Sequence, residues 1–148
     1  MTTQTPPLMG RLVPLLAFVY VVAGIRLGLD FWDRTNAFWF GTYFTIPLAL
    51  AYIGLGRRWG EVRWTTMAGT LLLVGLLGLL VANSIAYTTG QFMGWPDGRF
   101  PDPADSTGGK ILAGLSNGAL PGAGAGTAWC LIWGTLLIWL PVRCCPRK

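Results

Sequence analysis

Histidine is absent from this chain of 148 residues, and charged residues make up only 11% of it. Without histidine the chain cannot build histidine-ligated haem or a histidine-containing zinc site. Soluble domains carry roughly 25% charged residues, so the low charge excludes an ordinary water-soluble domain. The composition therefore predicts that most of this protein is surrounded by lipid.

Cysteine is also scarce, occurring as Cys130 and as the adjacent pair Cys144 and Cys145. This spacing is not C-x-x-C, which excludes a thioredoxin-like redox pair and a zinc ribbon. We interpret the adjacent pair as reduced thiols, with lipidation or metal contact as the alternatives. The sequence predicts no metal site and no cofactor.

A catalytic constellation is missing as well. The six carboxylates all fall in predicted loops or near predicted helix ends, so none is paired inside the membrane for proton relay. We expect a noncatalytic protein. A lipid-modifying activity built on Arg26 and Asp30 is the enzymatic alternative.

Four long apolar stretches dominate what is present. A helix needs roughly 20 residues to cross a hydrocarbon core of about 30 Å, and stretches of this kind lie at about 12–30, 37–55, 64–87 and 119–142. They predict that residues 1–148 form a single all-α domain, an integral membrane four-helix bundle. The polar segment at about 88–117 is predicted to be one longer extracytoplasmic loop between the third and fourth stretches.

The distribution of positive charge predicts the orientation. With four crossings, both termini and the loop "RRWGEVR" at 57–63 share one side, which carries seven Lys and Arg residues against four on the other. Cytoplasmic segments are enriched in Lys and Arg, so we predict that both termini are cytoplasmic (N-in, C-in). Abundant Arg, Gly, Ala and Pro are typical of a GC-rich bacterial genome. We therefore expect the membrane to be a bacterial inner membrane. Attraction to anionic lipid accounts for the net positive charge, so the predicted partners are membrane lipids and not nucleic acid.

Small residues recur at every fourth position of the last two stretches. Such stripes let two helices approach closely and gain van der Waals contacts that lipid tails do not replace. They predict tight packing of the stretch 119–142, either against 64–87 of the same chain or against another subunit. The residues are Gly78, Ala82 and Ala86 in the third stretch and Gly118, Gly122, Gly126, Cys130 and Gly134 in the fourth.

Pro47 falls at the middle of the second stretch. A proline there removes one hydrogen bond and clashes with the preceding turn, which bends the helix. We predict a kink packed against neighbouring helices, with a hinge or a ligand-facing notch as the alternative.

Arg26 interrupts the first stretch, and Asp30 follows one helical turn later. One interpretation is structural, because an arginine near a helix end can extend its guanidinium group to the headgroups and pair with the acid. The other is that Arg26, Asp30 and Asn83 line one polar pocket at the outer ends of the first and third stretches. Asn83 motivates this second interpretation, since a side-chain amide among apolar neighbours requires a hydrogen-bond partner.

These observations favour a noncatalytic subunit, stabiliser or assembly factor of a larger inner-membrane complex. Its partners would be other membrane-protein subunits or a second copy of the chain. The alternative is a small transporter, or a membrane protein that binds a lipid or small ligand, using the pocket near Arg26, Asp30 and Asn83.

The predicted layout can be tested with reporter fusions. Reporters inserted in the 57–63 loop and in the segment around Asp97 to Asp105 should show opposite sides of the membrane, because one predicted crossing, 64–87, lies between them. Finding both reporters on one side would contradict the four-span layout.

Overall fold

The structure is a computed structural model that describes residues 7–32, 45–57, 59–94 and 105–144. Within these ranges every regular element is helical and none is a strand, so the all-α prediction is confirmed. Three helices are long and apolar enough to cross a membrane: Leu8–Trp32, Trp64–Met93 and Thr107–Cys144. A fourth apolar helix, Ile46–Gly56, is shorter. These features are those of a membrane protein.

The first and second helices are single elements, whereas the other two are composite. The first is α1 (Leu8–Trp32) and the second is α3 (Ile46–Gly56), followed by the short 3-10 turn η2 (Trp59–Glu61). The third helix joins α4 (Trp64–Leu73), the π-helical segment η3 (Val74–Leu80) and α5 (Val81–Met93). The last helix joins α6 (Thr107–Ala119), η4 (Leu120–Gly126), α7 (Thr127–Gly134), η5 (Thr135–Trp139) and α8 (Leu140–Cys144), of which η4 and η5 are π-helical.

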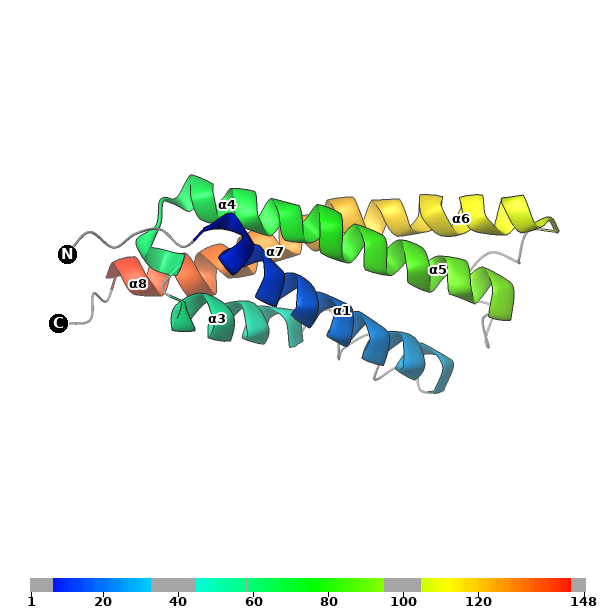
Figure 1. Cartoon of the computed structure of the whole chain (residues 1–148), viewed down its shortest axis with the longest axis horizontal. Coiled ribbons are helices and arrows are strands. Elements are labelled where there is room, and N and C mark those ends of the chain that lie inside the picture. The colour runs from blue at the N-terminus through cyan, green and yellow to red at the C-terminus, as the bar shows by residue number, and fades with distance from the viewer. Residues whose placement is uncertain (1–6, 33–44, 58, 95–104, 145–148) are drawn as a thin grey trace.

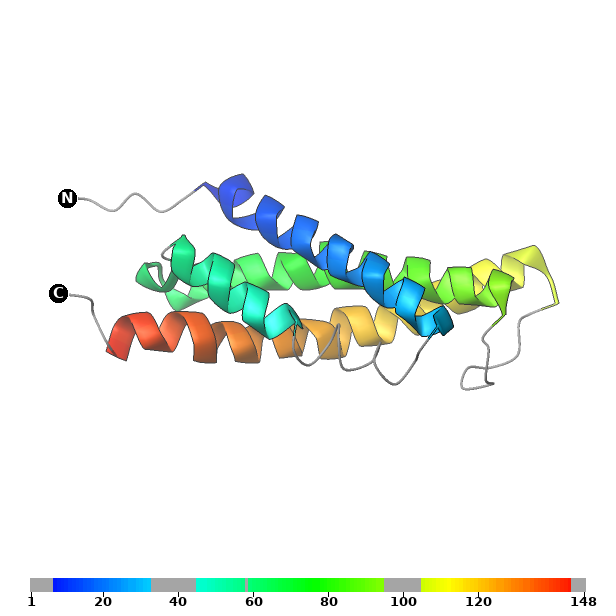
Figure 2. The ribbon, with the colours of Figure 1, turned by 90° about the horizontal axis from the view of Figure 1, so that it is seen from below.

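The third and last helices lie side by side along their length, with α1 and α3 packed on them (Figures 1 and 2). The amino end of α1, the turn η2 and the end of α8 lie together at what we call the basal end. The end of α5 and the start of α6 form the opposite, distal end (Figure 1). Toward the distal end α1 diverges from α5 (Figure 1).

The third and last helices touch through glycines in a regular antiparallel register. A Cβ atom on Gly114, Gly118 or Gly122 would lie under 3.0 Å from backbone atoms of Thr88, Ser84 or Leu80, respectively. Gly75 approaches Thr127 in the same register, and Gly134 meets the side chain of Leu71. From Gly114 to Gly122 each contact moves four residues up one helix and four down the other, so the last helix packs against the third helix of its own chain.

The two small-residue stripes face different partners. Gly78 lies against Val19 and Leu16 of α1, where a Cβ would be 3.1 and 3.2 Å from their side chains. Cys130 is fully buried in the core, and Gly126 is half-buried. Gly78 in the stripe of the third helix therefore packs on α1. The glycines of the last helix instead contact Leu80, Ser84 and Thr88 of the third helix.

The hydrophobic core lies in the basal half of the molecule. Trp59 from the turn η2 is 1% exposed and joins core residues from all four helices. The hydroxyl of Tyr20 donates to the carbonyl of Leu77, and the Trp64 indole donates to Thr135 Oγ1 at 3.0 Å. The core residues are Leu12, Leu15, Val19, Ile46, Leu50, Trp59, Val62, Met67, Leu71, Val74, Cys130 and Ile138.

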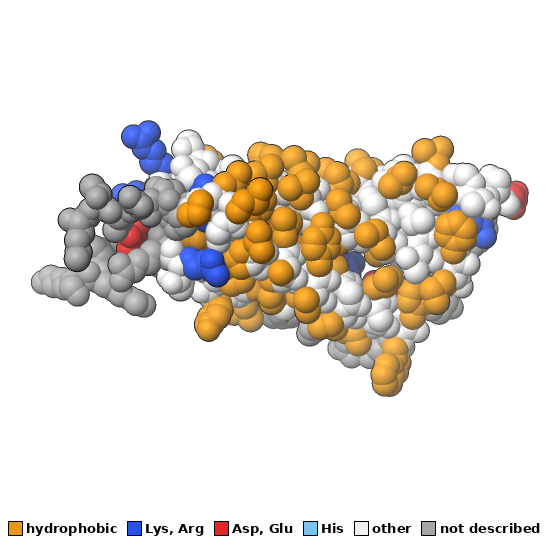
Figure 3. Space-filling view, in the orientation of Figure 1, with side chains coloured by type: hydrophobic (Ala, Val, Ile, Leu, Met, Phe, Trp, Pro, Cys, Tyr) orange, Lys and Arg blue, Asp and Glu red, His pale blue; other side chains and the backbone are white. Residues whose placement is uncertain are grey.

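Much of the remaining apolar surface points outward. Only 22% of the most apolar window of Leu8–Trp32 is buried. Hydrophobic side chains spread over the middle of the molecule, and basic ones lie toward its ends (Figure 3). A surface of this kind is suited to lipid contact.

The predicted outer loop at about 88–117 is wrong over most of its length. Residues up to Met93 belong to α5 and residues from Thr107 onward belong to α6. This extra helix contains four glycines among its 13 residues and is less hydrophobic than α1, so hydropathy alone does not reveal it. It is stabilised by the close contact of Gly114 and Gly118 with Thr88 and Ser84, and by the Ser106 side chain, which accepts a hydrogen bond from the Gly109 N–H at 3.1 Å.

Other helix bounds also differ from the prediction. The first helix begins at Leu8 and ends at Trp32, beyond both predicted limits. Because α3 begins at Ile46, Pro47 stands in its first turn, where a missing N–H is tolerated, and not at the middle of a described helix. Residues 37–44 of the predicted second span lie outside the described residues, so the kink remains a prediction.

The glycine contacts make a matched pair of substitutions informative. Gly122→Ala should destabilise the protein by about 1–3 kcal/mol, because its new methyl group would meet the backbone of Leu80. Gly124→Ala has open space around it and should be neutral, or stabilising by up to about 1 kcal/mol through helix propensity. Denaturant titration of the detergent-solubilised protein measures both, and equal effects would contradict the packing.

Candidate functional site

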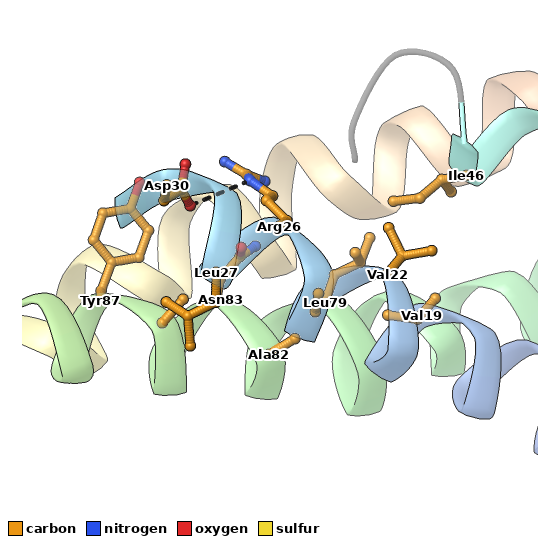
Figure 4. A pocket seen from close by; sticks show the side chains of 12 residues that line it. Val19, Val22, Arg26, Leu27, Asp30, Ile46, Leu79, Ala82, Asn83 and Tyr87 are labelled. Atoms are coloured by element: carbon orange, nitrogen blue, oxygen red, sulfur yellow. Dashed lines mark ion pairs between the residues drawn. The ribbon is translucent and has the colours of Figure 1, made fainter. Parts of the chain in front are cut away.

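A small cavity lies between the distal half of α1 and the helix α5. Its volume is about 60 Å³. Arg26, Leu27 and Asp30 line it from α1, and Asn83 and Tyr87 line it from α5 (Figure 4). Apolar side chains close the rest of the wall: Val19, Val22, Ala23, Ile46, Leu79, Ala82 and Ala86.

Helical periodicity places these side chains together. On α1, Val22, Arg26 and Asp30 are spaced by four residues and so lie on one face. On α5, Asn83 and Tyr87 have the same spacing and project toward α1 (Figure 4). The divergence of α1 leaves the space between these two faces.

The charges of the site belong to one ion pair. Arg26 Nε lies 3.8 Å from Asp30 Oδ2, and the two side chains are 32% and 20% exposed. Figure 4 shows Tyr87 rising from α5 toward Asp30 and Asn83 lying near Arg26. Since both charged groups reach the surface, the cavity is open there, and its formal charge is zero.

The chemistry available at this site is binding and orientation. It contains no thiol, no histidine and no carboxylate pair. Among the described residues no group of three His, Cys, Asp or Glu side chains could hold a metal ion. A pocket for a small metabolite typically has about 300–1,000 Å³, whereas a water molecule needs roughly 10–15 Å³. The cavity therefore has room for a few water molecules or one small polar group.

The structure brings the three predicted pocket residues Arg26, Asp30 and Asn83 to one cavity. It adds Tyr87, which the sequence analysis did not single out. Tyr87 stands one turn after Asn83 on the same helix face, and this spacing could have identified it. Comparison with protein families, curated proteins and solved structures gives no match for the chain. The interpretation of the site consequently depends on its own geometry.

A second, shallow depression lies on the apolar surface between α1 and α3. Its volume is about 360 Å³, and Phe18, Leu48, Ala49, Tyr52 and Ile53 line it together with Thr45. Pro47 is buried and does not line it. The depression carries no charged group, so it is suited to apolar contact and not to chemistry.

Cys130 and Cys144 line neither cavity. Cys130 is a buried free thiol in the core, and Cys144 is an exposed free thiol at the end of α8. Cys145 lies outside the described residues.

The strength of the Arg26–Asp30 interaction can be measured with a double-mutant cycle. Arg26→Gln and Asp30→Asn should show a coupling free energy of about 0.3–1 kcal/mol, since the pair is partly exposed. Arg63→Gln with Asp30→Asn is the control and should show additivity, because Arg63 lies at the basal end. A coupling of several kcal/mol would show that lipid or a partner excludes water from the site.

Proposed function

We propose that this protein is a noncatalytic subunit, stabiliser or assembly factor of a larger complex in a bacterial inner membrane. In this proposal the chain is a four-helix membrane bundle with both termini in the cytoplasm. The basal end, with its Arg and Trp side chains, lies at the cytoplasmic surface, in keeping with the enrichment of Lys and Arg there.

The observation that carries the proposal is the length of the last two helices. The third helix has 30 residues and the last has 38, which correspond to about 45 and 57 Å at 1.5 Å per residue. A hydrocarbon core is about 30 Å thick, and about 40–45 Å with the headgroups. With the basal Trp64 and Trp139 at the inner interface, the distal parts of α5 and α6 extend beyond the hydrocarbon.

This distal extension keeps large apolar side chains on its outer surface. Leu112 is 69% exposed and Met93 is 68% exposed, and Phe92, Ile111 and Leu115 are exposed as well. Beyond the hydrocarbon these side chains face neither lipid tails nor a core of their own chain. Exposed apolar surface of this kind is typical of protein interaction sites. A membrane-protein partner, or a second copy of the chain, would cover it.

The second candidate function is a small transporter or a binding protein for a lipid or small ligand. The cavity lined by Arg26, Asp30 and Asn83 favours it. The small volume of that cavity limits the ligand to water or a group of a few atoms. For this reason we place the subunit role first.

The two functions are separated by mass measurement after solubilisation in mild detergent at native expression. We expect a species heavier than one chain. Leu112→Gln should reduce recovery of that species by roughly tenfold or more, because it places a polar group in an apolar contact. Thr65→Gln, an exposed position on α4 at the basal end and outside the proposed contact, is the control and should leave recovery unchanged.

A strictly monomeric chain, in both the native protein and the variants, would overturn the subunit role. It would leave the cavity as the remaining basis for a function.

A further inference from the structure

A buried arginine with no ion-pair partner among the described residues lies at the basal end. Arg11 of α1 is only 8% exposed. Its Nη1 donates to the Thr66 carbonyl at 3.4 Å, a long hydrogen bond, and its Nε is buried with no hydrogen-bond partner. No carboxylate of a described residue forms an ion pair with it. Burying a charge is strongly unfavourable unless the charge is paired and hydrogen-bonded, and within the described part of the chain Arg11 has no counter-ion.

A second guanidinium group contacts the same turn of α1. Arg57, which follows α3, donates from Nη1 to the Gly10 carbonyl at 2.7 Å. Pro14, four residues after Gly10, has no N–H for that carbonyl, so Arg57 supplies the missing donor. This hydrogen bond holds Arg57 at Gly10, the residue immediately before Arg11. Each arginine has five N–H donors. Within the described residues Arg11 and Arg57 each donate one hydrogen bond, so most of their donors have no protein acceptor there.

Two helix amino ends add to the positive potential. The hydrogen bond from Arg11 to Thr66 joins α1, near its start, to the first turn of α4. Neither first turn contains an acidic residue, and no side chain caps the start of α4. Helix amino ends present free N–H groups and the positive end of the helix dipole, and they bind phosphate.

We propose that a phosphate group binds at the basal end, between the amino ends of α1 and α4, held by Arg11 and Arg57. The planar guanidinium fork matches phosphate oxygens with paired hydrogen bonds. Trp64 starts α4 at this level, and tryptophan is enriched where lipid headgroups lie. The phosphate is therefore that of an anionic phospholipid headgroup, and the site is selective for acidic over zwitterionic lipid.

The test uses the full chain in mild detergent, with phosphatidylglycerol, phosphatidylcholine or inorganic phosphate as the probe. Thermal unfolding and native mass spectrometry report binding. Phosphatidylglycerol should raise the unfolding midpoint of the native protein and remain bound in the gas phase. Arg11→Gln and Arg57→Gln should each weaken its apparent affinity by about tenfold or more, through loss of charge-assisted hydrogen bonds.

Arg143→Gln is the matched control, because it removes one positive charge from the same end. The guanidinium group of Arg143 contacts the carbonyls of Glu61 and Val62 and the ring of Trp139, none of which Arg11 or Arg57 contacts through a hydrogen bond. This variant should keep phosphatidylglycerol affinity within about twofold. Arg11→Met should keep or raise the midpoint in phosphatidylcholine, because it removes an unpaired buried charge.

Several results would overturn the proposal. One is an equal midpoint of the native protein in the two lipids. Another is an undiminished phosphatidylglycerol response in both Arg11→Gln and Arg57→Gln. A lower midpoint of Arg11→Met in both lipids, with the response intact, would show that Arg11 is only a structural brace. Stabilisation by inorganic phosphate in competition with phosphatidylglycerol would keep the phosphate site but overturn the lipid as its occupant. If the Arg11 variants do not fold, Arg57→Gln and lipid retention by the native protein decide the question.

Discussion

Backbone contact between the third and last helices is the constraint on which the rest of the structure depends. Gly114, Gly118 and Gly122 leave room for the backbone of α5 and η3, and side chains at these positions would force the helices apart. Lipid tails compete equally well for large apolar side chains, so a membrane helix pair gains most where its backbones come close. The register repeats that gain from Gly114 through Gly122 to Thr127.

The other two helices are positioned by this pair. α1 packs on Gly78 and donates from Tyr20 to the Leu77 carbonyl, whereas α3 approaches η5 where Gly54 faces Ile138. The core these contacts form fills the basal half. Because α1 diverges toward the distal end, the same helices leave the polar cavity there, with Arg26 and Asp30 neutralising one another. The helices thus pack tightly in the basal half and leave a cavity in the distal half.

The basal end is held by arginines that donate to main-chain carbonyls. Arg11 reaches Thr66, Arg57 reaches Gly10, and Arg143 reaches the carbonyls of Glu61 and Val62. These hydrogen bonds join elements far apart in the sequence. One of them satisfies the Gly10 carbonyl, for which Pro14 has no N–H, and the others reach carbonyls near the start of α4. In the proposed phosphate site Arg11 and Arg57, but not Arg143, use their remaining N–H groups for the lipid phosphate. Structural bracing and headgroup binding are compatible roles for one set of residues.

Composition and hydropathy alone determined that the chain is all-helical and membrane-embedded, because a backbone in hydrocarbon must satisfy its own hydrogen bonds. The spacing of Gly118, Gly122 and Gly126 likewise predicted a close helix contact, and the isolated polar residues Arg26 and Asn83 left a shared pocket as one of two interpretations. Only the tertiary structure decided which helix the glycines meet, that Tyr87 joins the pocket, and that α5 and α6 replace most of the predicted loop. The physical reason is that these outcomes depend on the register between distant segments. A helix stabilised by its neighbour through Gly, Ser and Thr carries little hydrophobic signal of its own.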